Sequence, residues 1–235
     1  MQRFFINRPL RETEIFDDEI FHQITRVLRM KKGDQIILFC GDGVEYLYEL
    51  TNFSKKSVEC VQREKYEPTG RESSKNITLY QSLPNKMEKL EWIVQKNTEL
   101  GVQKIIFFRS DRSQKLFLSD SKKERIKAIS REALEQCGGL FPVEIIFSDE
   151  NLESILKNKN PDEKRLFLHT EGQKTQLNEL VNEEKFGIFI GPEGGWSGSE
   201  IQEMNENNLI IVHLGGRILR TETAGMCMAF GLNNL

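Results

Sequence analysis

The feature that most constrains the fold is a series of short apolar runs that do not alternate with polar residues. They lie at 77–83, 104–108, 143–147, 165–169, 186–190 and 209–214, with helical patterns between them. A strand that is apolar on both sides is buried on both faces, and strands interleaved with helices form parallel sheets. The sequence therefore predicts an α/β domain whose ligand site lies off the carboxyl ends of the strands.

The first part of the chain has a different pattern. Short apolar or alternating runs at 34–40, 44–50 and 57–65 are separated by turn signals, which is typical of a small β-barrel. Residues 64–76 lose all hydrophobic pattern and carry Pro68 and Gly70, as linkers do. We therefore predict two domains, at residues 1–70 and 76–235.

Composition excludes several classes of protein. The chain has 235 residues, of which 38% are hydrophobic and 29% charged, as in ordinary globular proteins. Four cysteines far apart, without a CxxC pair, and three scattered histidines argue against zinc and a disulfide framework. The first residues lack an apolar signal core, and no run approaches the length of a membrane span. We expect a cytoplasmic protein without metal or membrane contact.

Charge is unevenly distributed although the net charge is only −3. Residues 104–131 hold nine Lys or Arg against three Asp or Glu, whereas residues 132–206 hold six against sixteen. A second basic cluster, at 22–32, contains no acidic residue. Two separated basic clusters could follow a phosphate backbone, but solvated helix faces would explain them equally well.

Three predicted strand ends carry unusual loops, at 168–172, 191–195 and 214–222. The glycine-rich "GPEGG" (191–195) lacks the Lys-Ser/Thr of a phosphate-binding loop, and the carboxylate of Glu193 would repel phosphate. A neutral or cationic ligand lying against bare backbone fits better. The alternative is a tight turn before the helix predicted near residue 197.

The third loop combines Gly215 and Gly216 with two cations. Arg217 and Arg220 could hold a phosphate or stabilise a developing anion. In the structural alternative, Thr221 is the N-cap of the last helix and Glu222 favours its dipole. Both interpretations can hold together.

Several segments resemble one family, in the same order along nearly the whole chain. They are "HQITRVLRMKKGD" (22–34), "KMEKLEWIVQKNTELGV" (86–102), "REALEQCG" (131–138), "GPEGGWSGSE" (191–200) and "LGGRILRTETA" (214–224). This pattern is similar to the ribosomal small-subunit (16S) RNA uridine-N3 methyltransferases of the SPOUT class. The resemblance implies a PUA-like RNA-binding barrel, a methyltransferase domain with a trefoil knot, S-adenosylmethionine as methyl donor, and a homodimer. It thus implies an enzyme that methylates uridine N3 in 16S RNA or the assembled small subunit.

The resemblance also implies the residues that line the cofactor, by position in the matching motifs, whereas the catalytic and RNA-contacting residues are hypotheses from the chemistry of methyl transfer and from the basic residues. Arg220 and Glu222 are the candidate catalytic residues. The residues expected to line the cofactor are Leu168, His169, Thr170, Gly191, Glu193, Gly194, Leu214, Gly215, Ile218, Leu219 and Arg220. The residues expected to contact RNA are Arg3, His22, Arg26, Arg29, Arg109, Arg112 and Arg131.

The chain departs from the family pattern at two positions. Gly139 stands where arginine is usual, so one expected RNA-contacting cation is missing, and Gly216 stands where proline is common. The alternatives to the predicted activity are a SPOUT methyltransferase for another RNA site, a non-catalytic RNA-binding assembly factor, and an unrelated nucleotide enzyme. The "HxxxxVLR" pattern (22–29) argues against the first, and the missing phosphate motif against the last.

Overall fold

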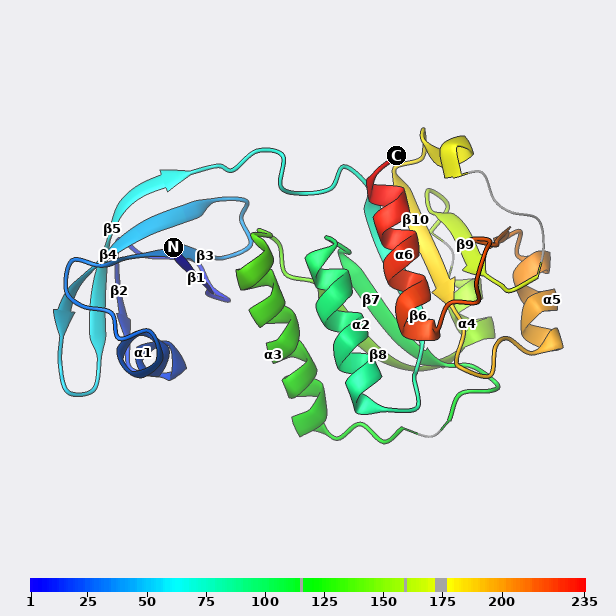
Figure 1. The fold of residues 1–235 in the computed structure, drawn as a ribbon, viewed down its shortest axis with the longest axis horizontal. Coiled ribbons are helices and arrows are strands. Elements are labelled where there is room, and N and C mark those ends of the chain that lie inside the picture. Colours follow the sequence, from blue (N-terminus) through cyan, green and yellow to red (C-terminus); the bar gives the residue numbers. More distant parts are fainter. Residues whose placement is uncertain (115, 159, 172–176) are drawn as a thin grey trace. The chain divides into compact units, whose positions relative to one another are not determined.

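The computed structural model describes residues 1–114, 116–158, 160–171 and 177–235, which form two compact units (Figure 1). Unit 1 comprises residues 1–72 and 134–142, and unit 2 comprises residues 73–133 and 143–235. The sequence suggested two contiguous segments. The structure instead assigns to unit 1 the last turn of α3 (Asp120–Cys137) and the residues after it.

Unit 1 is built on a curved five-stranded sheet (Figure 1). Its strands are β1 (Gln2–Phe5), β2 (Thr13–Phe16), β3 (Gln35–Phe39), β4 (Glu45–Phe53) and β5 (Val58–Tyr66), in the order β1-β3-β4-β5-β2. Pairing is antiparallel except between β1 and β3. The sheet is a half-barrel with β1 and β2 as its edges. Sequence patterns missed these two strands because each has only four residues.

The core of unit 1 lies between this sheet and one helical segment. The segment consists of α1 (Glu19–His22) and the π-helical turn η1 (Gln23–Val27). Ile24 of η1 is fully buried in one cluster with Phe4 and Tyr48 of the sheet.

A buried arginine ties β1 to the end of α3 within unit 1. The Arg3 Nε donates to Glu45 Oε1 at 2.7 Å, and its two terminal nitrogens donate to the carbonyl oxygens of Leu134, Glu135 and Gly139. Arg3 is 8% exposed and Glu45 is fully buried. Last-turn carbonyls of a helix lack intrahelical donors, so the guanidinium satisfies groups that would otherwise be unpaired.

Unit 2 contains a six-stranded sheet in which every pairing is parallel. Its strands are β6 (Asn76–Ser82), β7 (Lys104–Arg109), β8 (Glu144–Asn151), β9 (Lys164–Leu168), β10 (Lys185–Ile190) and β11 (Ile210–Val212), in the order β11-β9-β10-β6-β7-β8. The predicted parallel sheet is confirmed by these registers.

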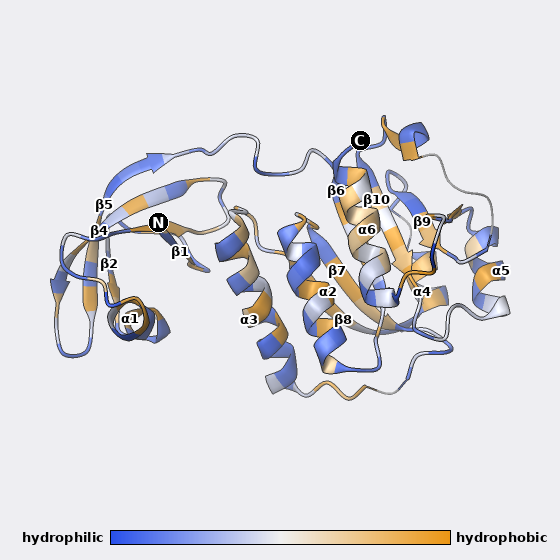
Figure 2. Ribbon diagram, in the orientation of Figure 1, coloured by the Kyte–Doolittle hydropathy of each residue, from blue (hydrophilic) through white to orange (hydrophobic). Residues whose placement is uncertain are grey.

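Helices cover both faces of this sheet, which explains the apolar strands. Leu79 and Phe107 pack in one cluster with α2 (Met87–Glu99), α3 and α6 (Thr221–Asn233). The next residues along the same strands, Tyr80 and Phe108, pack in a second cluster with α4 (Leu152–Lys157) and α5 (Gly198–Glu206). Figure 2 shows hydrophobic colour along the strands of the sheet and a mixture of hydrophilic and hydrophobic residues on α2 and α3, whereas α6 is largely hydrophobic. A short 3-10 turn, η2 (Leu177–Leu180), precedes β10.

The strand order reverses around β9. β10 pairs with one edge of β9 and β11 pairs with the other, although β10 and β11 follow one another in the chain. The loops after these strands therefore diverge from one point on the carboxyl edge of the sheet. Such a reversal is where open α/β sheets bind ligands.

The buried arginine yields a stability prediction. We expect Arg3→Met to lower the free energy of unfolding by about 3–5 kcal/mol, because it leaves buried Glu45 and the α3 carbonyls short of donors. Arg63→Met removes an arginine–glutamate pair of the same sheet that is partly exposed, and should cost under about 1 kcal/mol. Urea unfolding followed by circular dichroism measures both. Equal costs would contradict the structural role of Arg3.

Candidate functional site

A cavity of about 560 Å³ opens at the carboxyl ends of β9, β10 and β11. Its wall consists of Arg112, Leu168, His169, Thr170, Glu171, Ile190, Gly191, Pro192, Gly194, Gly195, Trp196, Gly198, Ile201, Val212, His213, Leu214, Gly215, Gly216, Arg217, Ile218, Leu219, Thr221 and Ala224. All three loops singled out from the sequence contribute to this wall. Gly172, the last residue of the first loop, lies outside the described residues.

Glycines let the backbone itself form much of the wall. A Cβ at Gly191 would lie 3.1 Å from the Trp196 ring, and one at Gly194 would lie 3.2 Å from Arg112 Cβ. Gly215 and Gly216 form the turn after β11 with φ of +74° and +70°. Proline, which the resemblance leads us to expect at the second of these positions, cannot adopt a positive φ, so Gly216 permits a turn that proline would not.

Trp196 joins two of the three loops. Its side chain is 4% exposed, and its Nε1 donates to the Leu168 carbonyl oxygen at 3.0 Å. The ring also packs where a side chain at Gly191 would lie, and it stacks on Phe108. The indole therefore fixes the loop after β10 against the end of β9.

Thr221 joins the same loop to α6, in a way that the sequence did not predict. The N-cap of α6 is Arg220, not Thr221. The Thr221 hydroxyl instead donates to the Gly191 carbonyl oxygen at 2.6 Å and accepts from Gln81 Nε2 at 2.9 Å. The hydroxyl of Thr221 therefore does not cap α6, as expected from the sequence, because it is engaged with the Gly191 carbonyl oxygen.

Most residues expected to line a cofactor lie together on the cavity wall. Those that do are Leu168, His169, Thr170, Gly191, Gly194, Leu214, Gly215, Ile218 and Leu219. Glu193 and Arg220 are not part of this wall. His213 is half-buried and also lies on the wall.

Glu193 is held on the outer side of its loop. Its Oε1 accepts from Lys89 Nζ at 2.7 Å and from the Asn85 backbone N–H at 3.2 Å. Burial by itself would raise the pKa of Glu193, but these hydrogen bonds and the lysine charge hold that pKa below its ordinary value. The carboxylate thus fixes the loop to the start of α2, whose N-cap is Lys86.

The two candidate catalytic residues lie at the start of α6. Arg220 is exposed, and its carbonyl oxygen accepts the N–H groups of Thr223 and Ala224. Glu222 Oε2 is buried, and no donor among the described residues reaches it. A buried carboxylate oxygen without a donor is uncommon, because desolvation then goes uncompensated. This atom is therefore available to a group that brings its own proton.

Arg112 lies on the cavity wall and is positioned by its neighbours. Its Nη1 donates to the Gly194 carbonyl oxygen at 3.1 Å. The preceding Asp111 donates its N–H to Glu200 and accepts from the Ser197 hydroxyl at 2.6 Å. Ser197 is the N-cap of α5 in a capping box with Glu200, so the capped helix also anchors the arginine loop.

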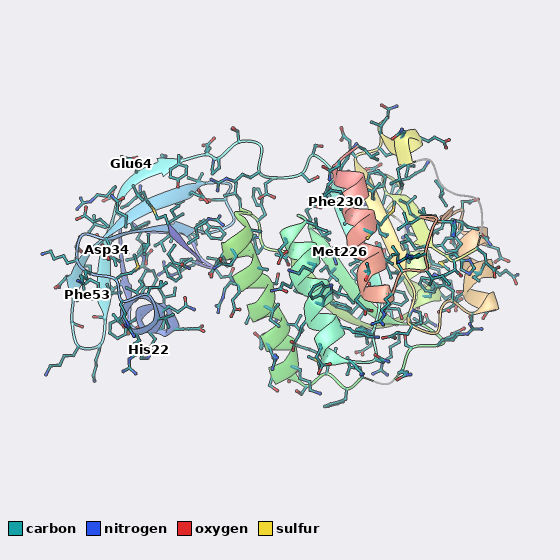
Figure 3. All side chains as sticks on the ribbon, in the orientation of Figure 1. His22, Asp34, Phe53, Glu64, Met226 and Phe230 are labelled. Carbon is teal, nitrogen blue, oxygen red and sulfur yellow. The ribbon has the colours of Figure 1, made fainter. Side chains whose placement is uncertain are left out.

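The residues expected to contact RNA are distributed over both units. His22, Arg26 and Arg29 belong to unit 1, where Arg26 and Arg29 are exposed and Figure 3 labels His22 at the end of α1. Arg109 and Arg112 are exposed and Arg131 is half-buried, all in unit 2. Lys115, part of the predicted basic segment, lies outside the described residues.

Arg3 was also expected to contact RNA, but its side chain is buried, with 8% exposed. Its guanidinium already donates to Glu45 and to three carbonyl oxygens, including that of Gly139. A Cβ at Gly139 would lie 2.7 Å from a Leu134 methyl group, so a larger residue here would have to displace that side chain. Arg3 therefore supports the fold rather than an RNA surface.

Arg29 has an unusual backbone conformation. Its φ is +54°, in the left-handed region where a non-glycine side chain is disfavoured. The flanking N–H groups of Leu28 and Met30 donate to Gln23 and Ile24, so Arg29 occupies the position that glycine usually holds at a helix end. The chain keeps a cation where glycine would fit more easily.

Sequence reasoning missed three groups at the site. Gln81, Thr221 and Trp196 touch the strand-end loops through their side chains. Tryptophan directly after "GPEGG" was the one available signal. No group of histidine, cysteine and acidic residues suited to a metal occurs in the described ranges, and no helix there is long and apolar enough to cross a membrane.

Family models match both parts of the chain. An RNA methyltransferase domain matches residues 71–232, and an RNA methyltransferase PUA domain matches residues 16–62. Among curated proteins, the ribosomal RNA small subunit methyltransferase E of Bacillus subtilis is 34% identical, over 95% of this chain and 93% of its own length. That of Buchnera aphidicola (from Acyrthosiphon pisum) is 31% identical, over 96% and 89%.

A solved structure extends the similarity to the fold. The ribosomal RNA small subunit methyltransferase E of Neisseria gonorrhoeae, crystallised bound to S-adenosylmethionine, aligns with a TM-score of 0.89 and 28% identity. The alignment covers 100% of this chain and 97% of that one.

The ion pair at Glu193 yields a pH prediction. Because the folded-state pKa is lowered, its stabilising contribution is present above the ordinary glutamate pKa and is lost as pH falls through the lower folded value. We expect Lys89→Met to raise the Glu193 pKa and to destabilise the protein at neutral pH but not once Glu193 is protonated in both states. Carboxyl NMR titration and unfolding at several pH values test this. A Glu193 titration unchanged by Lys89→Met would contradict it.

Proposed function

We propose, from the premise that the chain belongs to the ribosomal RNA small subunit methyltransferase E family, that it methylates N3 of a uridine in 16S ribosomal RNA with S-adenosylmethionine as methyl donor. The observation that carries this proposal is the glycine-walled cavity at the ends of β9, β10 and β11.

The cavity fits this methyl donor in size and in chemistry. Its volume is in the range of pockets that hold small molecules. Glycine walls let backbone N–H and C=O groups read the edges of an adenine, which the family resemblance assigns to the residues of the three loops. Glu171 places a carboxylate residue on the wall, which a positively charged sulfonium tolerates. When bound, S-adenosylmethionine supplies an electrophilic methyl group.

Two residues at the start of α6 supply the remaining chemistry in this proposal. Uridine N3 must lose its proton before its lone pair can attack the methyl group. Glu222, whose Oε2 has no donor in the described chain, accepts that proton. Arg220 stabilises the charge that then spreads over the uracil carbonyl oxygens. The target base is unpaired or drawn out of its helix, since N3 is hidden in a base pair.

The cations of both units hold the RNA in the same proposal. His22, Arg26 and Arg29 belong to unit 1, and residues 1–70 form the RNA-binding domain. Arg109, Arg112 and Arg131 belong to the methyltransferase domain, residues 76–235. Contacts from arginine to phosphate are independent of sequence and supply affinity and orientation.

Knotting and dimerisation complete the proposal. We infer from the family resemblance that the chain after β10 is threaded into a trefoil knot, and that the reversed strand order around β9 belongs to it. The protein is proposed to be a homodimer. Figure 3 labels Met226 and Phe230 about one turn apart on α6, and Phe230 is 58% exposed, which provides apolar surface for a partner copy. The substrate places the protein in the cytoplasm.

The first prediction of this proposal concerns turnover. We expect small-subunit RNA from cells lacking the protein to lose one N3-methyluridine, which mass spectrometry detects. Re-expression of the wild type or of Glu206→Gln, a change on α5 away from the cavity wall, should restore it. Glu222→Gln should lower the methylation rate of the purified enzyme by about 10²–10⁴-fold while leaving cofactor binding intact, because it removes a base and keeps the shape.

Two results would overturn parts of this proposal. N3-methyluridine that persists without the protein would favour a non-catalytic assembly factor or another RNA site. Full activity of Glu222→Gln would exclude Glu222 as the proton acceptor and leave the methyl transfer itself in place.

The second prediction uses the left-handed residue of unit 1. Arg29→Gly should leave stability unchanged or raise it by up to about 1 kcal/mol, because glycine suits the backbone there. RNA affinity should fall, and the slope of log affinity against log salt should shrink by about 0.7–0.9 for each phosphate that the variant no longer neutralises. Asn208→Gly, at the left-handed residue of unit 2 (φ +59°), is the matched control and should leave RNA binding unchanged. Equal RNA affinity in both variants would remove Arg29 from the RNA surface.

A further inference from the structure

A continuous line of side-chain interactions crosses the sheet beneath the cavity. Gln81, at the end of β6, donates to the Thr221 hydroxyl at 2.9 Å, and that hydroxyl donates to the Gly191 carbonyl oxygen at 2.6 Å. On the other side of Gly191 lies the Trp196 ring, which donates to the Leu168 carbonyl oxygen. The line thus connects β6, α6, β10 and β9.

The direction of these hydrogen bonds is fixed by their surroundings. Gln81 Nε2 also donates to the carbonyl oxygen of Ser82 at 3.0 Å, which only the amide nitrogen can do. The Thr221 hydroxyl has a single hydrogen, and it is used on Gly191 because a carbonyl oxygen cannot donate. Gln81 is fully buried and Thr221 is 7% exposed, so water does not compete for these groups.

We propose that Gln81 and Thr221 are positioning residues for the methyl donor, acting through the Gly191 carbonyl. This inference rests on the proposed cofactor cavity and deepens it. Gly191 and Thr221 lie on the cavity wall, whereas Gln81 does not. Gln81 therefore acts through its hydrogen bond to Thr221. The hydroxyl turns the Gly191 carbonyl toward α6 and sets the place where the loop after β10 begins.

Apart from the Thr221 hydrogen bond, the backbone at Gly191 is confined by its neighbours. A Cβ there would lie 3.1 Å from Trp196, and the following residue is Pro192, which has no N–H and a fixed φ. If the Thr221 hydroxyl is removed, the Gly191 carbonyl is left without its side-chain donor, and Gln81 Nε2 keeps only the Ser82 carbonyl oxygen as an acceptor. The loop then relaxes away from the geometry in which its backbone meets the ligand.

The chain offers a matched control for Thr221. Thr98 in α2 is 3% exposed, its hydroxyl donates to the Val94 carbonyl oxygen at 2.8 Å, and it shares a hydrogen bond of 3.1 Å with the Ser130 hydroxyl. Thr98 is therefore a buried threonine with one carbonyl and one side-chain partner, like Thr221, but it is not on the cavity wall. Thr98→Val and Thr221→Val remove the same atom in comparable surroundings.

The test compares S-adenosylmethionine binding with thermal stability in the full-length protein. Titration calorimetry should show that Thr221→Val weakens binding roughly tenfold or more, whereas Thr98→Val changes it little although both lower the melting temperature. Thr221→Ser keeps the hydroxyl and should restore binding to near the wild-type value. Gln81→Met should weaken binding several-fold, and in turnover the KM for S-adenosylmethionine should rise while the KM for RNA stays constant.

The outcomes separate this inference from the proposed function. Wild-type protein that does not bind S-adenosylmethionine would overturn both. Wild-type binding with equal affinities in Thr221→Val and Thr98→Val, or with Thr221→Ser as weak as Thr221→Val, would overturn the positioning role alone. Should Thr221→Val not fold, unchanged binding by Gln81→Met would overturn it.

Discussion

The site depends on a sheet that is buried on both faces. Because α2, α3 and α6 cover one face and α4 and α5 the other, neither face is open to a ligand. The carboxyl edge remains accessible, and the parallel arrangement brings the ends of β9, β10 and β11 to that edge together. The reversal of strand order around β9 then separates their loops, which leaves space for the cavity between them.

Polar side chains around the cavity mostly hold backbone rather than face the ligand site. Thr221 and Trp196 bind the carbonyl oxygens of Gly191 and Leu168, and Glu193 binds Lys89 on the outer side of its loop. A cavity walled by glycine has little stiffness of its own, so its shape comes from these surrounding interactions. Glu222 differs, because one buried oxygen has no donor in the described chain.

Arginines of unit 1 have opposite roles although they look alike in the sequence. Arg3 is buried against Glu45 and the end of α3, where it satisfies carbonyl oxygens. Arg29 is exposed and held in a left-handed conformation. The first stabilises the fold, and the second retains a cation at some cost in backbone energy. The carbonyl oxygen of Gly139 accepts a hydrogen bond from Arg3.

The sequence by itself determined the parallel sheet, the β-rich first part, the family and the three loops of the cavity. These follow from local signals: two-sided apolar runs, turn residues and motifs whose order is fixed along the chain. Only the tertiary structure decided that Glu193 faces Lys89, that Thr221 binds Gly191 instead of capping α6, and that Arg3 is buried. The partners in these three cases are 104, 30 and 131 residues apart in the chain, the last being Arg3 and Leu134. The sequence determines the chemistry of each side chain, but the packing of distant segments determines which group that side chain contacts.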